Sequence, residues 1–137
     1  MSKILINRTD SIFIAGHNGM VGKAINKAFL SNGYKNILKV EKSLLDLRDQ
    51  FKVNEWFKKN KPKIVIIAAA KVGGILANQR YPVEFLLDNL KIQNNIIESA
   101  WQYKSKRLLF LGSSCIYPRF ANQPIKEEYL MSNSLEP

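Results

Sequence analysis

Two side chains near the end of the chain could do chemistry together. Ser113 and Cys115 lie two positions apart and directly follow an apolar run that ends at Leu111. A hydroxyl can hold a substrate carbonyl oxygen, and a thiol can exchange a proton with a carbon that an adjacent ketone makes acidic. A lone cysteine is more often a packing residue than a catalyst, so the spacing alone leaves both interpretations open.

A second group of residues has the pattern of a phosphate-binding turn. Gly16, Gly19 and Gly22 follow the apolar stretch at residues 11–15. Such glycines allow a sharp turn, close approach of a pyrophosphate, and close packing of the next helix on a sheet, while N–H groups at the helix start face the anion. The spacing is G-x-x-G-x-x-G, whereas the general dinucleotide fingerprint is G-x-G-x-x-G. A glycine-rich turn without a ligand is therefore the alternative.

The elements that must position these residues alternate along the chain. Apolar runs at residues 11–15, 37–40, 64–70 and 107–111 predict strands, and helical periodicity predicts helices in the three intervals between them. Residues 64–70 are apolar throughout, which is typical of a central parallel strand. The alternation predicts an α/β fold, a Rossmann-type doubly wound parallel sheet with right-handed crossovers. For its four strands we predict the order 3-2-1-4.

Ligands of such sheets bind at the carboxyl ends of the strands. The third predicted strand runs into Ala68, Ala69, Ala70 and Lys71, where small side chains would let a cofactor approach. The second ends near Glu41 and Lys42, about 20 residues past the glycines, where a ribose-reading residue belongs. An acidic group there would accept from a 2′-hydroxyl, and a cation would meet a 2′-phosphate. The residues alone leave the choice between NAD and NADP open.

Composition limits the other classes of function. The chain has 137 residues, 46% hydrophobic, which suits one folded domain. Its longest apolar run is about seven residues, far short of the roughly 20 that cross a bilayer. The single cysteine cannot form an intramolecular disulfide, which fits a cytoplasmic protein, and no zinc-binding spacing is present, so we expect no metal. The net charge of +10 raises a nucleic-acid interpretation, but the lysines are scattered without interleaved aromatics, so we expect no such partner.

Several motifs together resemble those of the GDP-L-fucose synthases, which are extended short-chain dehydrogenases/reductases. The resemblance runs from about Ser11 to Pro137. It rests on Gly16–Gly22, Ala68–Gly74, Leu111–Pro118 and Leu135–Pro137.

The resemblance implies a reaction and a set of site residues. The reaction is epimerisation of GDP-4-keto-6-deoxy-D-mannose at C3 and C5, followed by hydride transfer from NADPH to C4; NAD is the less favoured cofactor. Ser113 would polarise the C4 carbonyl, Cys115 would act as acid or base, and Asn89 would face the substrate. The resemblance also implies a homodimer. The implied cofactor-binding residues are Gly16, His17, Asn18, Gly19, Met20, Val21, Gly22, Lys42, Asp46, Leu47, Ala68, Ala69, Ala70, Lys71, Leu111, Gly112, Ser113 and Ser114.

The chain departs from that family's pattern in its last part. A Tyr-x-x-x-Lys pair should follow, in which the lysine lowers the tyrosine pKa for proton donation. Tyr103 with Arg107, and Tyr129 with Asn133, have the wrong partner. We therefore expect residues 1–137 to be the amino-terminal part of an NAD(P)-binding Rossmann domain, without the substrate domain and inactive alone. The alternatives are a non-catalytic dinucleotide-binding module and another nucleotide-sugar epimerase or dehydratase of the same class.

Overall fold

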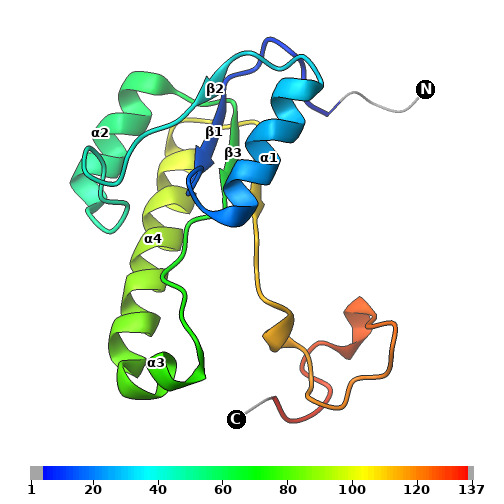
Figure 1. Ribbon diagram of the computed structural model, residues 1–137. Coiled ribbons are helices and arrows are strands. Elements are labelled where there is room, and N and C mark those ends of the chain that lie inside the picture. Colours follow the sequence, from blue (N-terminus) through cyan, green and yellow to red (C-terminus); the bar gives the residue numbers. More distant parts are fainter. Residues whose placement is uncertain (1–4, 136–137) are drawn as a thin grey trace.

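The computed structural model describes residues 5–135. Of the predicted closing motif, Glu136 and Pro137 lie outside the described residues. Four parallel strands form one sheet, and helices cover both of its faces (Figure 1). The strands are β1 (Ile12–Ala15), β2 (Ile37–Leu38), β3 (Ile64–Ile67) and β4 (Arg107–Phe110). The α-helices are α1 (Met20–Ser31), α2 (Gln50–Asn60), α3 (Ile75–Arg80) and α4 (Pro82–Gln102), and the 3-10 helices are η1 (Ser114–Ile116) and η2 (Glu127–Tyr129).

The predicted fold class is confirmed, but the predicted strand order is wrong. The order is β2-β1-β3-β4, not 3-2-1-4, because β3 pairs with β1 in the register Ile12↔Ile64 to Ala15↔Ile67. All four residues of β1 and of β3 are buried, so each of these strands needs a neighbour on both sides. β2 has only two half-buried residues and lies at the sheet edge. The connection through α2 therefore carries the chain back past β1.

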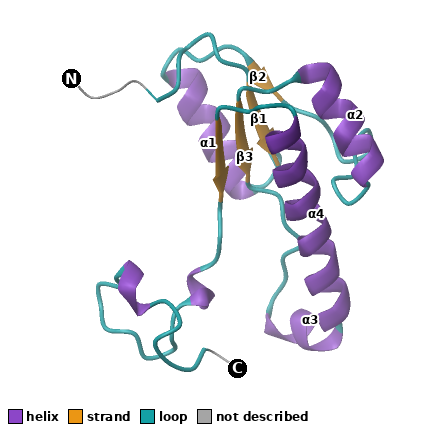
Figure 2. Cartoon of the chain, turned by 180° about the vertical axis from the view of Figure 1, so that it is seen from behind, coloured by secondary structure: helices purple, strands orange, loops and turns teal. Residues whose placement is uncertain are grey.

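Alternate residues of the central strands feed two separate layers of the core. On one face Ile12, Ile14, Ile64 and Ile66 pack with side chains that include Ile25 and Phe29 of α1. On the other face lie residues of β1 and β3 together with α2 and α4: Phe13, Ala15, Val65, Ile67, Val53, Phe57, Ile96 and Ala100. Figure 2 shows α1 on the opposite side of the sheet from α2 and α4, as a doubly wound fold requires.

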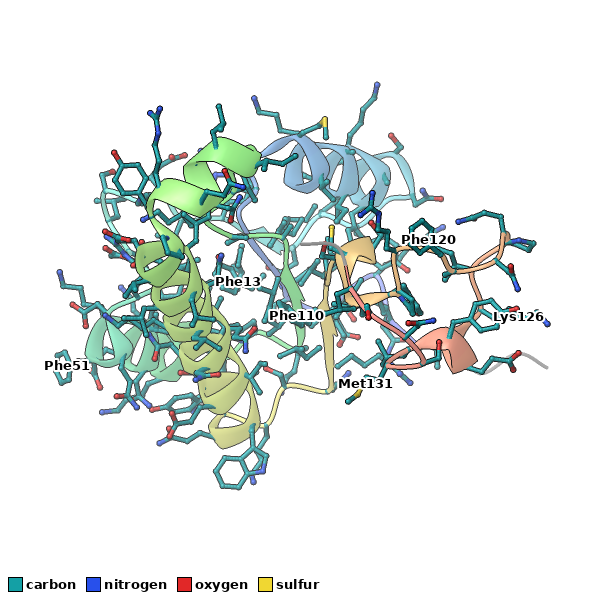
Figure 3. The ribbon with its side chains drawn as sticks, turned by 90° about the horizontal axis from the view of Figure 1, so that it is seen from below. Phe13, Phe51, Phe110, Phe120, Lys126 and Met131 are labelled. Atoms are coloured by element: carbon teal, nitrogen blue, oxygen red, sulfur yellow. The ribbon has the colours of Figure 1, made fainter. Side chains whose placement is uncertain are left out.

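Phe13 lies at the centre of the layer under α2. Its ring is 4.3 Å from the ring of Trp56 and 5.7 Å from that of Phe57 between centroids, and its side chain is fully buried. Burial of a side chain of this size stabilises the fold by about 1.5–3 kcal/mol. Phe51, on the same helix, points outward and is exposed (Figure 3). The stripe of α2 that faces the sheet is thus defined by Val53, Trp56 and Phe57.

The helix predicted between the third and fourth strands is present as α4. α4 starts at Pro82, a residue favoured in the first turn of a helix. The short helix α3, which was not predicted, precedes it and is joined to it through Tyr81. After β4 the chain runs away from the sheet through η1 and η2 (Figure 1).

Candidate functional site

A cavity of about 630 Å³ lies at the carboxyl ends of β1, β2 and β3. Its size is within the range of small-molecule and cofactor sites. The chain leaves β1 for β2 on one side and later returns to β3 on the other, so the loops diverge here, as at the switch point of other open α/β sheets. The walls are made by Phe13, Ala15–Val21, Val40–Lys42, Leu45–Arg48, Ala68–Val72, Asp88 and Ile92.

The glycine-rich loop forms the wall between β1 and α1. Gly16 has a φ of +84°, and a Cβ at this position would lie 2.6 Å from the carbonyl oxygen of Ala68, so neither the backbone nor the space suits another residue. A Cβ on Gly22 would lie 2.1 Å from the carbonyl oxygen of Gly16. Gly22 thus allows α1 to pack against the turn and does not line the cavity.

Gly19 differs from these two because no neighbouring atom of residues 5–135 requires it to be so small. The nearest atom to a Cβ on Gly19 would be the Gly16 carbonyl oxygen at 3.4 Å. Gly19 is the N-cap of α1, it lines the cavity, and the first turn carries no acidic side chain. The first turn of this 12-residue helix thus has no acidic side chain of its own, and its N–H groups favour an anion in the cavity.

Charged side chains link two of the loops that line the cavity. Arg48 contacts both carboxylate oxygens of Asp46, with Nη2 2.7 Å from Oδ2, and its Nη1 is 3.1 Å from Asp88 Oδ2. Lys71 Nζ reaches the same Asp88 oxygen at 3.0 Å. Arg48 lowers the pKa of Asp46 to about 2, and Lys71, followed by Arg48, lowers that of Asp88. Asp88 on α4 thus joins the loop after β2 to the loop after β3.

The pair of Asp46 and Arg48 gives a pH dependence with a defined sign. Because the folded pKa of Asp46 is about 2 against an ordinary 3.8, its contribution to stability is present above about pH 4 and is lost as the pH falls through 2. Asp46→Asn should be less stable than the unaltered chain at neutral pH, and the difference should vanish near pH 2. Urea unfolding of both proteins across this range checks it. A difference independent of pH would contradict the assignment.

The side chain of Asn89 is hydrogen-bonded to the loop that follows β3. Its Oδ1 accepts from the backbone N–H of Lys71 at 2.7 Å, and its Nδ2 donates to the carbonyl oxygen of Lys71 at 3.0 Å. Both ends of the amide therefore hold the loop that follows β3. A substrate contact by Asn89 stays a prediction, and the geometry gives this side chain the task of fixing one wall of the cavity.

The residues after β2 occupy the remaining wall. Glu41 Oε2 accepts from Asn18 Nδ2 at 2.8 Å, and Glu41 Oε1 lies 3.3 Å from His17 Nε2. The hydrogen bond from Asn18, and then that from His17, lowers the pKa of the Glu41 carboxyl. Lys42 lines the same cavity and makes no hydrogen bond or salt bridge with residues 5–135. A cation that makes no salt bridge, although its charge acts on Asp46, thus lies beside a carboxylate held by two side chains.

The two predicted catalytic residues lie outside this cavity. The Ser113 hydroxyl accepts from the backbone N–H of Cys115 at 3.2 Å, and Cys115 is exposed. Ser114 and Cys115 line a separate hollow of about 220 Å³. Leu111 and Gly112 do not line the larger cavity either. The catalytic roles of Ser113 and Cys115, and the cofactor contacts of residues 111–114, stay predictions.

Two charged wall residues of the larger cavity were missed from the sequence, although each had a signal. Arg48 and Asp88 are adjacent to Asp46–Leu47 and to Asn89, which were predicted. Within residues 5–135 no group of three or more histidine, cysteine or acidic side chains is arranged to hold a metal ion. No helix in this part of the chain has the length and apolar character to cross a membrane.

The family model that describes the NAD dependent epimerase/dehydratase family matches residues 12–137. The chain belongs to this family. It is 50% identical over 131 residues to GDP-L-fucose synthase 1 of Arabidopsis thaliana, a match that covers 96% of the chain and 41% of the relative. The chain thus spans about two fifths of the length of the curated relatives it matches.

Two solved structures carry the likeness into three dimensions. One is the GDP-mannoheptose C4 reductase MlghC from Campylobacter jejuni with NADP bound, with a TM-score of 0.89, 37% identity, and coverage of 96% of this chain and 41% of that one. The other is a GDP-L-fucose synthetase from Naegleria fowleri bound to NADP, with a TM-score of 0.84, 30% identity, and coverage of 98% and 40%. This chain shares the fold of both structures over nearly all of its residues.

Proposed function

We propose that this chain is the cofactor-binding part of an NADP(H)-dependent epimerase/reductase that converts GDP-4-keto-6-deoxy-D-mannose to GDP-L-fucose. The observation that carries the proposal is the cavity at the carboxyl ends of β1–β3, with a glycine-rich helix start on one wall and Lys42 on another. The relatives named GDP-L-fucose synthase and the NADP-bound solved structures support it. Residues 1–137 are then the amino-terminal part of an NAD(P)-binding Rossmann domain.

In this proposal each wall of the cavity binds a different part of the dinucleotide. The loop Gly16–Gly22 holds the pyrophosphate at the start of α1, where the helix dipole favours negative charge. Lys42 meets the 2′-phosphate, and Asp46 and Leu47 lie beside the adenine. Ala68–Lys71, fixed by Asn89, follow the cofactor toward the nicotinamide. Bound NADPH supplies the hydride that reduces C4.

The chain's own chemical groups act on the sugar. Ser113 donates to the C4 carbonyl oxygen and so stabilises the negative charge that develops there when a proton leaves C3 or C5. Cys115 gives or takes a proton on one face of the ring, and a second acid–base group that acts on the opposite face completes the inversion of the carbon. The proton that the C4 oxygen needs after hydride transfer comes from a group that residues 1–137 do not provide. The substrate is a GDP-sugar, and the whole protein is a cytoplasmic homodimer.

A second candidate is a dinucleotide-binding module that does not catalyse. The position of Ser113 and Cys115 outside the larger cavity favours it. The two functions differ in whether further sequence completes the site. If the proposal holds, an extension of the chain to the length of its relatives supplies a Tyr-x-x-x-Lys pair.

The test is oxidation of NADPH in the presence of GDP-4-keto-6-deoxy-D-mannose. We expect the 137-residue chain to be silent and the extended protein to turn over, because the proton for the C4 oxygen is missing from the shorter chain. Turnover by the 137-residue chain above a blank, abolished by Ser113→Ala, would contradict the division of the site between the two parts. An extended protein that binds NADPH but never oxidises it would favour the non-catalytic module.

A further inference from the structure

We propose that Glu41 is a positioning residue for the glycine-rich loop and does not read the adenosine ribose. The inference rests on the proposed function, since it takes the ligand of the cavity to be NADP(H). In many dinucleotide-binding folds the acidic residue that ends the second strand accepts from the ribose 2′-hydroxyl. Glu41 occupies that place in the chain, yet the structure gives its carboxylate other partners.

Both oxygens of Glu41 face the glycine-rich loop. Oε2 accepts from Asn18 Nδ2 at 2.8 Å, and Oε1 lies 3.3 Å from His17 Nε2. These contacts join residues 23 and 24 positions apart in the chain. Within residues 5–135 Glu41 is also the one hydrogen-bonding partner of the His17 and Asn18 side chains. The carboxylate therefore connects the end of β2 to the part of the loop between Gly16 and Gly19.

This connection fixes the part of the loop that must meet the pyrophosphate. The His17 side chain is 11% exposed, whereas that of Glu41 is 57% exposed, so the imidazole is largely buried while the carboxylate that it contacts reaches solvent. His17, Asn18 and Gly19 all line the cavity. A loop that is already held needs less ordering when the ligand binds, which favours affinity for any dinucleotide equally. The 2′-substituent plays no part in that effect.

Discrimination between the two dinucleotides then falls on the neighbouring residue. Lys42 lines the same cavity and has no hydrogen bond or salt bridge within the described chain. The Lys42 ammonium group makes no salt bridge, although its charge acts on Asp46, and it can bind a 2′-phosphate by a charge-assisted hydrogen bond. Glu41 and Lys42 thus have separate tasks, and the apparent conflict between an acidic and a basic residue at the end of β2 is resolved.

The inference is tested by titration of NADPH and NADH into the chain and into Glu41→Ala, Glu41→Gln, Asn18→Ala and Lys42→Ala. We expect Glu41→Ala and Asn18→Ala to weaken both cofactors by a similar factor, about three- to tenfold. Glu41→Gln keeps an acceptor for Asn18 and should recover most of the affinity. Lys42→Ala should weaken NADPH by about tenfold and leave NADH unchanged. The inference would be overturned if Glu41→Ala lowered the affinity for NADH but raised the affinity for NADPH.

A spectroscopic readout separates this inference from the proposed function. The chain contains one histidine, so the imidazole signals in an NMR spectrum belong to His17. Without cofactor, these signals should move in Glu41→Ala and stay in place in Lys42→Ala. If they do not move in Glu41→Ala, the positioning role is wrong even where dinucleotides bind. If they move but the unaltered chain binds neither cofactor, the contact stands and the proposed function is wrong.

Discussion

Replacement of Gly22 by alanine should lower the free energy of unfolding by about 3 kcal/mol or more, at the upper end of what an extra buried methyl group costs. The added Cβ would lie 2.1 Å from the carbonyl oxygen and 2.8 Å from the carbonyl carbon of Gly16, and both are backbone atoms that cannot rotate away. Relief requires α1 to move off the turn, and Ile25 and Phe29 to leave their places against the sheet. Urea unfolding of the variant and of the unaltered chain measures the loss.

Gly19→Ala is the matched control for this substitution. Its Cβ would come no closer than 3.4 Å to an atom of residues 5–135, so we expect stability within about 1 kcal/mol of the unaltered chain, the size of an N-cap effect. The same methyl group would stand where a pyrophosphate approaches the helix start, so the affinity for NADPH should fall by at least tenfold. Equal loss of stability in both variants would show that the glycines serve the turn alone.

Ser113→Ala should reduce kcat of the extended protein by about 100- to 1,000-fold, the usual loss when one donor to a developing oxyanion is removed. The affinity for NADPH should change little, because Ser113 lies outside the larger cavity. Steady-state oxidation of NADPH and a separate binding titration measure the two effects. Cys115→Ala provides a contrast, since it should abolish exchange of the C3 and C5 hydrogens with solvent deuterium. Undiminished turnover in Ser113→Ala would show that Ser113 takes no part in the reaction.

The fold class could be predicted because the uninterrupted apolar sequences of β1 and β3 indicate strands that are buried on both faces. Their residues are apolar without interruption, and the glycines follow β1 at once. The strand order could not be predicted from the same pattern, because periodicity records how deeply a strand is buried and not which strand lies beside it. β2 is an edge strand because β1 is its only partner in the described sheet, and it pairs there with Ile12 and Phe13 alone.

The candidate site, like the fold, could be predicted only in part. Residues carried by short segments next to strand ends, such as Lys42, Asp46 and Ala68, lie around one cavity as their positions in the sequence suggested. Contacts between residues far apart in the chain could not be foreseen. Asp88 meets Arg48 across 40 positions, and the amide of Asn89 is occupied by the backbone of Lys71 across 18. These pairings depend on how α4 lies against the loops.

Calorimetric titration of NADPH into the folded chain tests the central claim most directly. We expect saturable binding at one site that NADP⁺ competes away and that Gly19→Ala weakens by at least tenfold, with a stability change no larger than about 1 kcal/mol. Weak affinity is sufficient, since residues 111–114 lie outside the larger cavity and the nicotinamide half has few contacts in this part of the protein. The contradicting result is a folded chain that takes up no NADPH, or one whose binding Gly19→Ala leaves unchanged.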